Sequence, residues 1–111
     1  MNEIELKYLE DIRLAIADVY SYLEGRRTFE EFSKNRMLKQ AIERNLEIIG
    51  EATNNLLKVK PEIEITNARR IVNLRNLLIH AYDSINDTEL WAIVINHLPV
   101  LKSEVETLLS Q

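Results

Sequence analysis

The sequence predicts an all-α protein, an up-and-down four-helix bundle with one short extra helical turn. Three observations lead to this fold class. Apolar residues recur every three or four positions along most of the chain, only two glycines and two prolines interrupt its 111 residues, and capping residues precede the apolar stretches. A turn-rich β architecture would need more glycine and proline. At this length we expect a single domain spanning residues 1–111.

The first helix is predicted from about Glu3 to Leu23, where the apolar residues lie three or four positions apart. Gly25 is expected to close this helix, because glycine readily adopts the left-handed conformation that commonly ends one. The segment Thr28-Phe-Glu-Glu31 has a capping-box pattern, which predicts that one short helical turn begins there.

The second helix is predicted to begin after Ser33 or Asn35 and to end near Lys58. Asn45 interrupts its apolar stripe, and this amide is either a polar contact across the bundle or part of a site. Like charges at four-residue steps repel one another. We therefore expect Arg44 and the arginines of the third helix to pair with a row of three carboxylates, Glu43, Glu47 and Glu51.

Asn67 is expected to cap the third helix, which is predicted to end near Asp83. Its core-facing arc should consist of apolar residues, namely Ile71, Leu74, Leu77, Leu78 and Ala81. The segment Asn86-Asp-Thr-Glu89 starts the fourth helix, in which Trp91 is expected to anchor the bundle or an interface. Pro99 should kink or divide this helix, because proline removes one backbone donor and clashes with the preceding turn.

Composition limits the classes of function. A net charge of −4 argues against a protein that coats nucleic acid non-specifically, since such binding requires many phosphates to be neutralised. Two basic groups could still form a local site or could be ordinary solvated faces: Arg69, Arg70 and Arg75, and Arg36, Lys39 and Arg44. The chain has no cysteine, no apolar run long enough to span a membrane and no signal-peptide pattern at its start. We therefore expect a cytoplasmic protein without a membrane partner.

The third helix concentrates the groups that can do chemistry near neutral pH. Arg75 and Tyr82 lie seven positions apart, nearly in line on a helix, while Asn76 and His80 lie four apart and stack one above the other. Histidine titrates near neutrality, and the planar arginine fork binds phosphate oxygens at two points. Together they suit cleavage of an RNA phosphodiester without a metal ion. His80 would move the proton, Arg75 would stabilise the phosphoryl charge, and Asn76 would support them.

Val72 and Ile79 lie seven positions apart in the middle of this otherwise polar side of the helix. A solvent-facing helix has no reason to expose two apolar side chains there. The simplest explanation is a second subunit packed against them, and twofold symmetry is the commonest way to supply one. Such a homodimer would bring two copies of the arginine and histidine into one cleft.

The polar side chains also allow other interpretations. They could be a patch that merely fixes the register of a helix–helix contact. His80 and Asp83 have a spacing usable for metal binding, but two ligands are a weak signal and no third completes the set, so no metal or other cofactor is expected. His97 is interpreted as a helix-end residue.

The sequence resembles the HEPN domains, whose signature is Arg-x4-His-x-Tyr. Here Arg75-Asn76 is followed by His80 and Tyr82. The resemblance is to HepT, the toxin of bacterial and archaeal pairs of a HEPN protein and a minimal nucleotidyltransferase. It extends over nearly the whole chain and includes the segment Ala41-Ile-Glu-Arg-Asn-Leu-Glu-Ile-Ile-Gly-Glu51 and the tryptophan and Leu-Pro of the last helix.

The resemblance implies an all-α HEPN-like bundle, a homodimer and a metal-independent RNA endonuclease of a type VII-like toxin–antitoxin system. By position, Arg75 and His80 would be catalytic and Asn76 would support them. The partner nucleotidyltransferase would neutralise the toxin by transferring AMP to Tyr82. The alternative is a non-catalytic HEPN module that binds nucleotide or regulates the partner nucleotidyltransferase.

Overall fold

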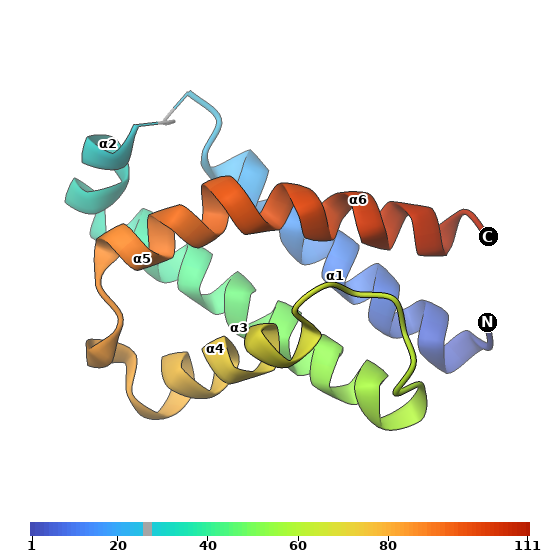
Figure 1. Cartoon of the computed structure of the whole chain (residues 1–111). Coiled ribbons are helices and arrows are strands. Elements are labelled where there is room, and N and C mark those ends of the chain that lie inside the picture. The colour runs from blue at the N-terminus through green and yellow to red at the C-terminus, as the bar shows by residue number, and fades with distance from the viewer. Residues whose placement is uncertain (26–27) are drawn as a thin grey trace.

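The computed structural model describes residues 1–25 and 28–111, apart from the side chain of Tyr82. Within these ranges the regular structure is helical, without a strand, which confirms the predicted all-α class (Figure 1). The elements in chain order are α1 (Glu3–Tyr22), α2 (Phe29–Lys34), α3 (Arg36–Val59), α4 (Ala68–His80), the 3-10 turn η1 (Tyr82–Ser84), α5 (Asp87–Ala92), the π-helical segment η2 (Ile93–His97) and α6 (Leu98–Leu109).

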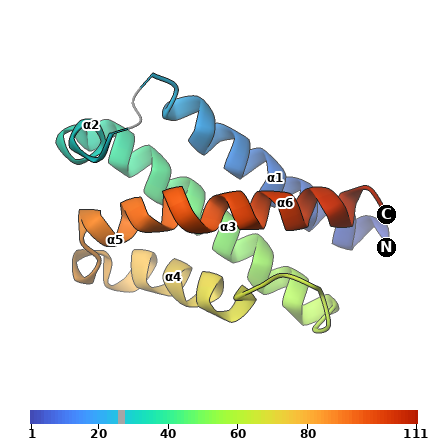
Figure 2. The same cartoon turned by 45° about the horizontal axis from the view of Figure 1, so that its top comes forward.

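The long helix α3 is the centre of the arrangement. It packs against α1 on one side and α4 on the other, and α6 packs along α1. Within the described residues, no Cα atom of α4 lies within 8 Å of α5 or α6. Figure 2 shows α4 and the α5–α6 stretch as separate layers. Helix α4 therefore makes its closest backbone approach to α3, which makes that contact decisive for the site.

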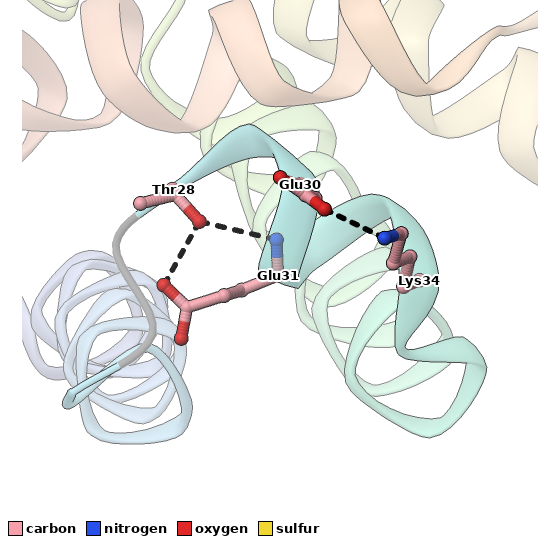
Figure 3. Close-up of polar contacts among 4 residues, drawn as sticks. All are labelled: Thr28, Glu30, Glu31 and Lys34. Atoms are coloured by element: carbon pink, nitrogen blue, oxygen red, sulfur yellow. Dashed lines mark hydrogen bonds and ion pairs between the residues drawn. The ribbon is translucent and has the colours of Figure 1, made fainter.

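Helix starts follow the predicted capping chemistry. Thr28 caps α2, since its Oγ1 accepts a hydrogen bond from the backbone N–H of Glu31 at 3.1 Å. The Glu31 carboxylate accepts from the Thr28 hydroxyl at 2.8 Å instead of reaching the Thr28 backbone (Figure 3). Lys34 and Glu30 form an ion pair along the same short helix at 2.6 Å. Gly25 has a φ of 75°, the left-handed conformation expected of it.

The predicted stripe of α3 is buried, including Asn45. Asn35 caps this helix through the N–H of Leu38 at 3.0 Å. The Nδ2 of Asn45 donates to the Ala41 carbonyl at 3.0 Å, within the same helix. This hydrogen bond stays within α3. It is neither a contact across the bundle nor part of a site, the two roles considered from sequence.

The fourth predicted helix is divided ahead of Pro99, as expected. The backbone N–H of Leu98 bonds to the carbonyl of Ile93, five residues earlier, which is the π-helical pattern. Pro99 then occupies the first turn of α6, where a missing N–H costs little. Trp91 anchors this part of the fold, because its ring packs against that of Phe32 with centroids 5.2 Å apart. In the described ranges, no helix is both long and apolar enough to cross a membrane.

Helix α4 departs from prediction at both ends. Asn67 occupies the N-cap position in a left-handed conformation with φ 58°, and its side chain makes no capping bond. The helix ends at His80, because Ala81 leaves helical geometry at φ −150° and ψ 47°. The expected extension to Asp83 is therefore wrong. Tyr82 starts the separate turn η1, so its predicted alignment with Arg75 on one helix is wrong as well.

The buried face of α4 is also rotated from the predicted arc. Leu77 was expected in the core but is 44% exposed, whereas Val72 was expected outside but is 5% exposed. Val72 and Leu78, both buried, flank Arg75 on the helical wheel. The packed face is thus centred on Arg75, roughly a quarter of a turn from the leucine-rich arc.

The physical reason for this rotation is Gly50. A Cβ atom at this position of α3 would lie 2.2 Å from the Cβ and 2.9 Å from the Cγ of Arg75, and 3.2 Å from the carbonyl oxygen of Ile71. The space left by the missing side chain, which we call the Gly50 notch, lets the two backbones approach and holds the aliphatic stem of Arg75. Apolar periodicity on α4 alone carries no information about a notch on its neighbour.

Replacing Gly50 by Ala is expected to destabilise the protein by about 1–3 kcal/mol, because the added methyl group forces α3 and α4 apart. Chemical denaturation followed by circular dichroism measures this free energy of unfolding. The control is Gln40→Ala, which changes an exposed residue of the same helix. In an unhindered helix interior, replacing glycine by alanine would instead stabilise the protein by about 1 kcal/mol. An increase in the free energy of unfolding would therefore contradict the close contact at Gly50.

Candidate functional site

A groove of about 340 Å³ lies over the central helix, with α3 as its floor and α1 and α4 as its walls. We call it the α3 groove. Six charged residues line it, from α1 Lys7 and Asp11, from α3 Arg44, Glu47 and Glu51, and from α4 Arg75. Its described lining thus carries three cations and three carboxylates. The groove combines these charged groups with apolar surface and has no formal net charge.

Each cation in the α3 groove is paired with a carboxylate. Lys7 lies 2.7 Å from Asp11, Arg44 lies 3.1 Å from Glu47, and Arg75 lies 2.5 Å from Glu51. Two carboxylates of the predicted row on α3 are therefore paired with the cations expected from sequence. These partly exposed pairs contribute little to stability, because water screens them.

The third carboxylate of the row, Glu43, lies beyond the groove. Burial raises the pKa of Glu43 above its ordinary value, while the nearby Lys39 opposes this effect by lowering the pKa. Lys39 itself bonds to Asp87 of α5 at 3.2 Å, so it is shared between two carboxylates. The basic group predicted around Arg36, Lys39 and Arg44 is thus mostly engaged in holding acids.

Arg75 is the cation most tightly held in the α3 groove. Its side chain is 26% exposed, and the stem lies against Gly50. At the head, Nη2 pairs with Oε2 of Glu51 at 2.5 Å, and Nη1 donates to Oδ1 of Asn76 at 2.8 Å. Among the described residues, the Nε of Arg75 is a buried donor without a hydrogen-bond partner. A permanent cation is therefore fixed at two nitrogens beside the amide of Asn76.

His80 and Asn76 lie on the outer side of α4, and both are exposed. They are four residues apart, so the imidazole stands one turn beyond the amide, as expected. His80 itself projects roughly 140° around the helix from Arg75. Asn76 bonds to Arg75, and His80 lies one helical turn beyond Asn76 on the exposed side of α4.

The structure brings together only part of the predicted site. Arg75 lines the α3 groove and bonds to Asn76, while His80 follows one turn beyond Asn76 on the exposed side of α4; we call these three residues the cluster. The side chain of Tyr82 lies outside the described part of the chain. Val72 is buried, so the expectation that it forms an exposed apolar patch is wrong, whereas Ile79 is 42% exposed and lines the groove. No group of three His, Asp or Glu side chains in the described ranges is placed to hold a metal ion.

Sequence reasoning missed Gly50 and the contribution of α1. Gly50 carried a usable signal, because a glycine inside a helix costs about 1 kcal/mol and usually has a packing reason. Lys7 and Asp11 carried none, since their position beside Arg75 depends on how α1 packs on α3. What the cluster can do is bind and stabilise an anionic oxygen at Arg75 and exchange a proton at His80.

Comparison with known families identifies the class of protein. The model of the family described as "Ribonuclease HepT-like" matches residues 12–108. The chain therefore belongs to the HepT-like ribonuclease family. Membership puts it among ribonucleases, for which RNA is the substrate, and agrees with the family expected from the Arg-x4-His-x-Tyr signature.

Curated relatives match along almost their whole length. A protein of Methanocaldococcus jannaschii named "Putative RNase MJ1380" is 39% identical over 96% of this chain and 98% of its own. One of Thermococcus cleftensis named "Probable ribonuclease HepT" is 36% identical over 97% of this chain and 98% of its own. A second Methanocaldococcus protein, "Putative RNase MJ0127", is 35% identical over 92% and 84%. No solved structure matches the chain significantly.

Changing Arg75 to Met should leave the protein folded, with a change in the free energy of unfolding within about 1 kcal/mol. Methionine keeps an unbranched stem in the Gly50 notch, removes the unpartnered buried Nε, and leaves Glu51 free to face water. Urea denaturation of both proteins tests this. A loss above about 3 kcal/mol would mean that the guanidinium holds the bundle together and would argue for a purely structural arginine.

Proposed function

We propose that the protein is a metal-independent RNA endonuclease that acts as a cytoplasmic toxin, with Arg75 and His80 as its catalytic residues. One observation carries this proposal. In a chain of the HepT-like ribonuclease family, α4 carries a guanidinium held by Glu51 and Asn76 and, one turn beyond Asn76, an exposed imidazole. These are the two groups that phosphodiester cleavage needs when no metal ion takes part.

The reaction we propose is an internal transesterification. A neutral His80 imidazole takes the proton of the ribose 2′-hydroxyl, and the 2′-oxygen attacks the adjacent phosphorus. The bond from phosphorus to the 5′-oxygen breaks, and that oxygen receives a proton from a histidinium. The products are a 2′,3′-cyclic phosphate and a 5′-hydroxyl. Arg75 stabilises the negative charge that builds up on the non-bridging oxygens.

A homodimer would supply the second histidine and complete the site. Within one chain, Arg75 and His80 project from different sides of α4, so a phosphate beside the guanidinium is best reached by an imidazole from a second copy. Ile79 of the predicted apolar pair is exposed and supports such packing, whereas Val72 is buried and cannot contribute. Twofold symmetry would then pair one base with one acid.

The partner we propose is a minimal nucleotidyltransferase antitoxin that transfers AMP to the Tyr82 hydroxyl. This step rests on the family resemblance, because the predicted alignment with Arg75 is lost. Tyr82 follows α4 directly and lies two positions beyond His80. The transfer would add a bulky anionic group to the chain two positions beyond the imidazole.

A non-catalytic HEPN module that binds nucleotide or regulates the nucleotidyltransferase is the second candidate. One observation favours it. Every cation in the described lining of the α3 groove already has a carboxylate partner, so the groove offers RNA no net positive field. Catalysis by the cluster would have to come from local geometry.

Replacing His80 by Ala is expected to lower RNA cleavage about 100- to 10,000-fold, the range for loss of a general acid–base group. The chain offers a matched control in its other histidine, since His97 is also exposed but lies away from the α3 groove. His97→Ala should cleave like wild type. Cleavage of a labelled single-stranded RNA in EDTA measures both and tests independence from metal ions.

Equal cleavage by wild type and His80→Ala would remove the enzymatic proposal and leave the regulatory module. Activity that EDTA abolishes would overturn metal independence while keeping the ribonuclease assignment of the family.

Co-expression with the proposed partner, a minimal nucleotidyltransferase, should increase the intact mass of the protein by whole AMP units and suppress its RNA cleavage. Tyr82→Phe should abolish the mass increase, because the acceptor oxygen is gone. Tyr22→Phe, which removes an exposed hydroxyl on α1, is the control and should be modified like wild type. Modification that persists in Tyr82→Phe would place the acceptor elsewhere.

A further inference from the structure

Arg75 has an unusual position for a catalytic arginine, because it lies at the centre of the face with which α4 packs on α3. Burying part of a charged side chain in a helix contact is costly unless the charge is paired and its donors are satisfied. Two consecutive residues of α3 meet this need. Gly50 admits the stem, and Glu51 binds the head.

We propose that Glu51 is the positioning residue for the RNA-cleaving arginine, an inference that rests on the function proposed above. Its Oε2 holds Nη2 of Arg75 at 2.5 Å, while Asn76 holds Nη1 at 2.8 Å. Two contacts on different nitrogens fix both the location and the plane of the guanidinium. The plane is thereby directed toward Asn76, and so toward the side of α4 that carries His80.

The unpartnered Nε strengthens this assignment. A buried donor without a partner is unfavourable, and each such group needs an explanation. Here the Gly50 notch confines the stem, so the guanidinium cannot turn to satisfy Nε without giving up the contacts at its other nitrogens. Glu51 and Asn76 therefore determine the orientation of the guanidinium, and the Nε–H donor is left without a partner as a result.

A competing account is that Glu51 merely occupies the arginine until RNA displaces it. The two accounts predict opposite results. If Glu51 positions Arg75, its removal slows the chemical step while RNA affinity changes little, because the phosphate still finds the charge but in a looser geometry. If Glu51 competes with phosphate, its removal tightens RNA binding and leaves the rate at saturation unchanged or higher.

The chain contains a matched control for this test. Glu47 lies one turn before Glu51 on the same helix and also pairs with an arginine, but that arginine is Arg44. Among the described residues, the carboxylate that pairs with Arg75 is that of Glu51 and not that of Glu47. Changing either glutamate removes the same charge from the same side of α3, so a difference between the two variants reports on contact with Arg75 alone.

The experiment measures single-turnover cleavage at saturating RNA and, separately, the affinity for the same RNA with 2′-O-methyl groups, which cannot be cleaved. Glu51→Ala should slow cleavage about 10- to 100-fold, as misplacement of a catalytic group does. Its affinity should stay within about 3-fold of wild type. Glu51→Gln, which keeps an oxygen acceptor for Nη2, should recover much of the rate. Glu47→Ala should behave like wild type in both measurements.

A wild-type rate in Glu51→Ala, or tighter RNA binding with an undiminished rate, would overturn the positioning role. Failure of the proposed function looks different, since wild type and His80→Ala would then show the same background cleavage. Nitrogen-15 NMR of the arginine side chains tests whether Glu51 holds the Arg75 guanidinium in place, and this measurement does not depend on RNA cleavage. Slow rotation of the Arg75 guanidinium should be seen in wild type and Glu47→Ala and should be lost in Glu51→Ala. Fast rotation in wild type would itself contradict the proposal.

Discussion

The close approach of α3 and α4 at Gly50 is the contact on which the remaining structure depends. The space left by the missing methyl group is filled by the stem of Arg75, which brings a cation to the centre of a helix–helix interface. Helix packing is set by the shapes of ridges and grooves, so a notch opposite a long side chain fixes how one helix is turned about its own axis. Because α3 is the long helix whose backbone comes closest to α4, this contact has the largest part in determining where the polar residues of α4 face.

The turning of α4 has consequences on both sides of the helix. On one side, Ile79 and the head of Arg75 reach the α3 groove. On the other side, leucines that would have filled a closed bundle line a second groove of about 430 Å³ between α4 and the α5–α6 stretch. The bundle is consequently open along this edge, and Leu77 stays 44% exposed.

Electrostatics explains how an acidic chain can belong to a family of ribonucleases. Its net charge of −4 gives no long-range attraction for RNA, and the cations of the α3 groove are matched by carboxylates. Local pairing fixes geometry even where it adds no net field, because an ion pair at one nitrogen and a hydrogen bond at another restrain the planar guanidinium of Arg75. In such a site, discrimination and rate depend on how precisely a few groups are oriented, and a small protein can provide that with two helices.

The sequence by itself determined the helices, the residues that begin and end most of them and the chemical identity of the polar cluster. These features are local: Thr28 and Asn35 cap through bonds within three residues, Gly25 adopts its φ alone, and Pro99 perturbs only the turn before it. Only the tertiary structure decided which face of α4 is buried, that Val72 lies inside and Leu77 outside, and that Lys7 and Asp11 border the groove. The physical reason is that burial is a property of two surfaces. The periodicity of α4 describes one of them, and the notch at Gly50 belongs to the other.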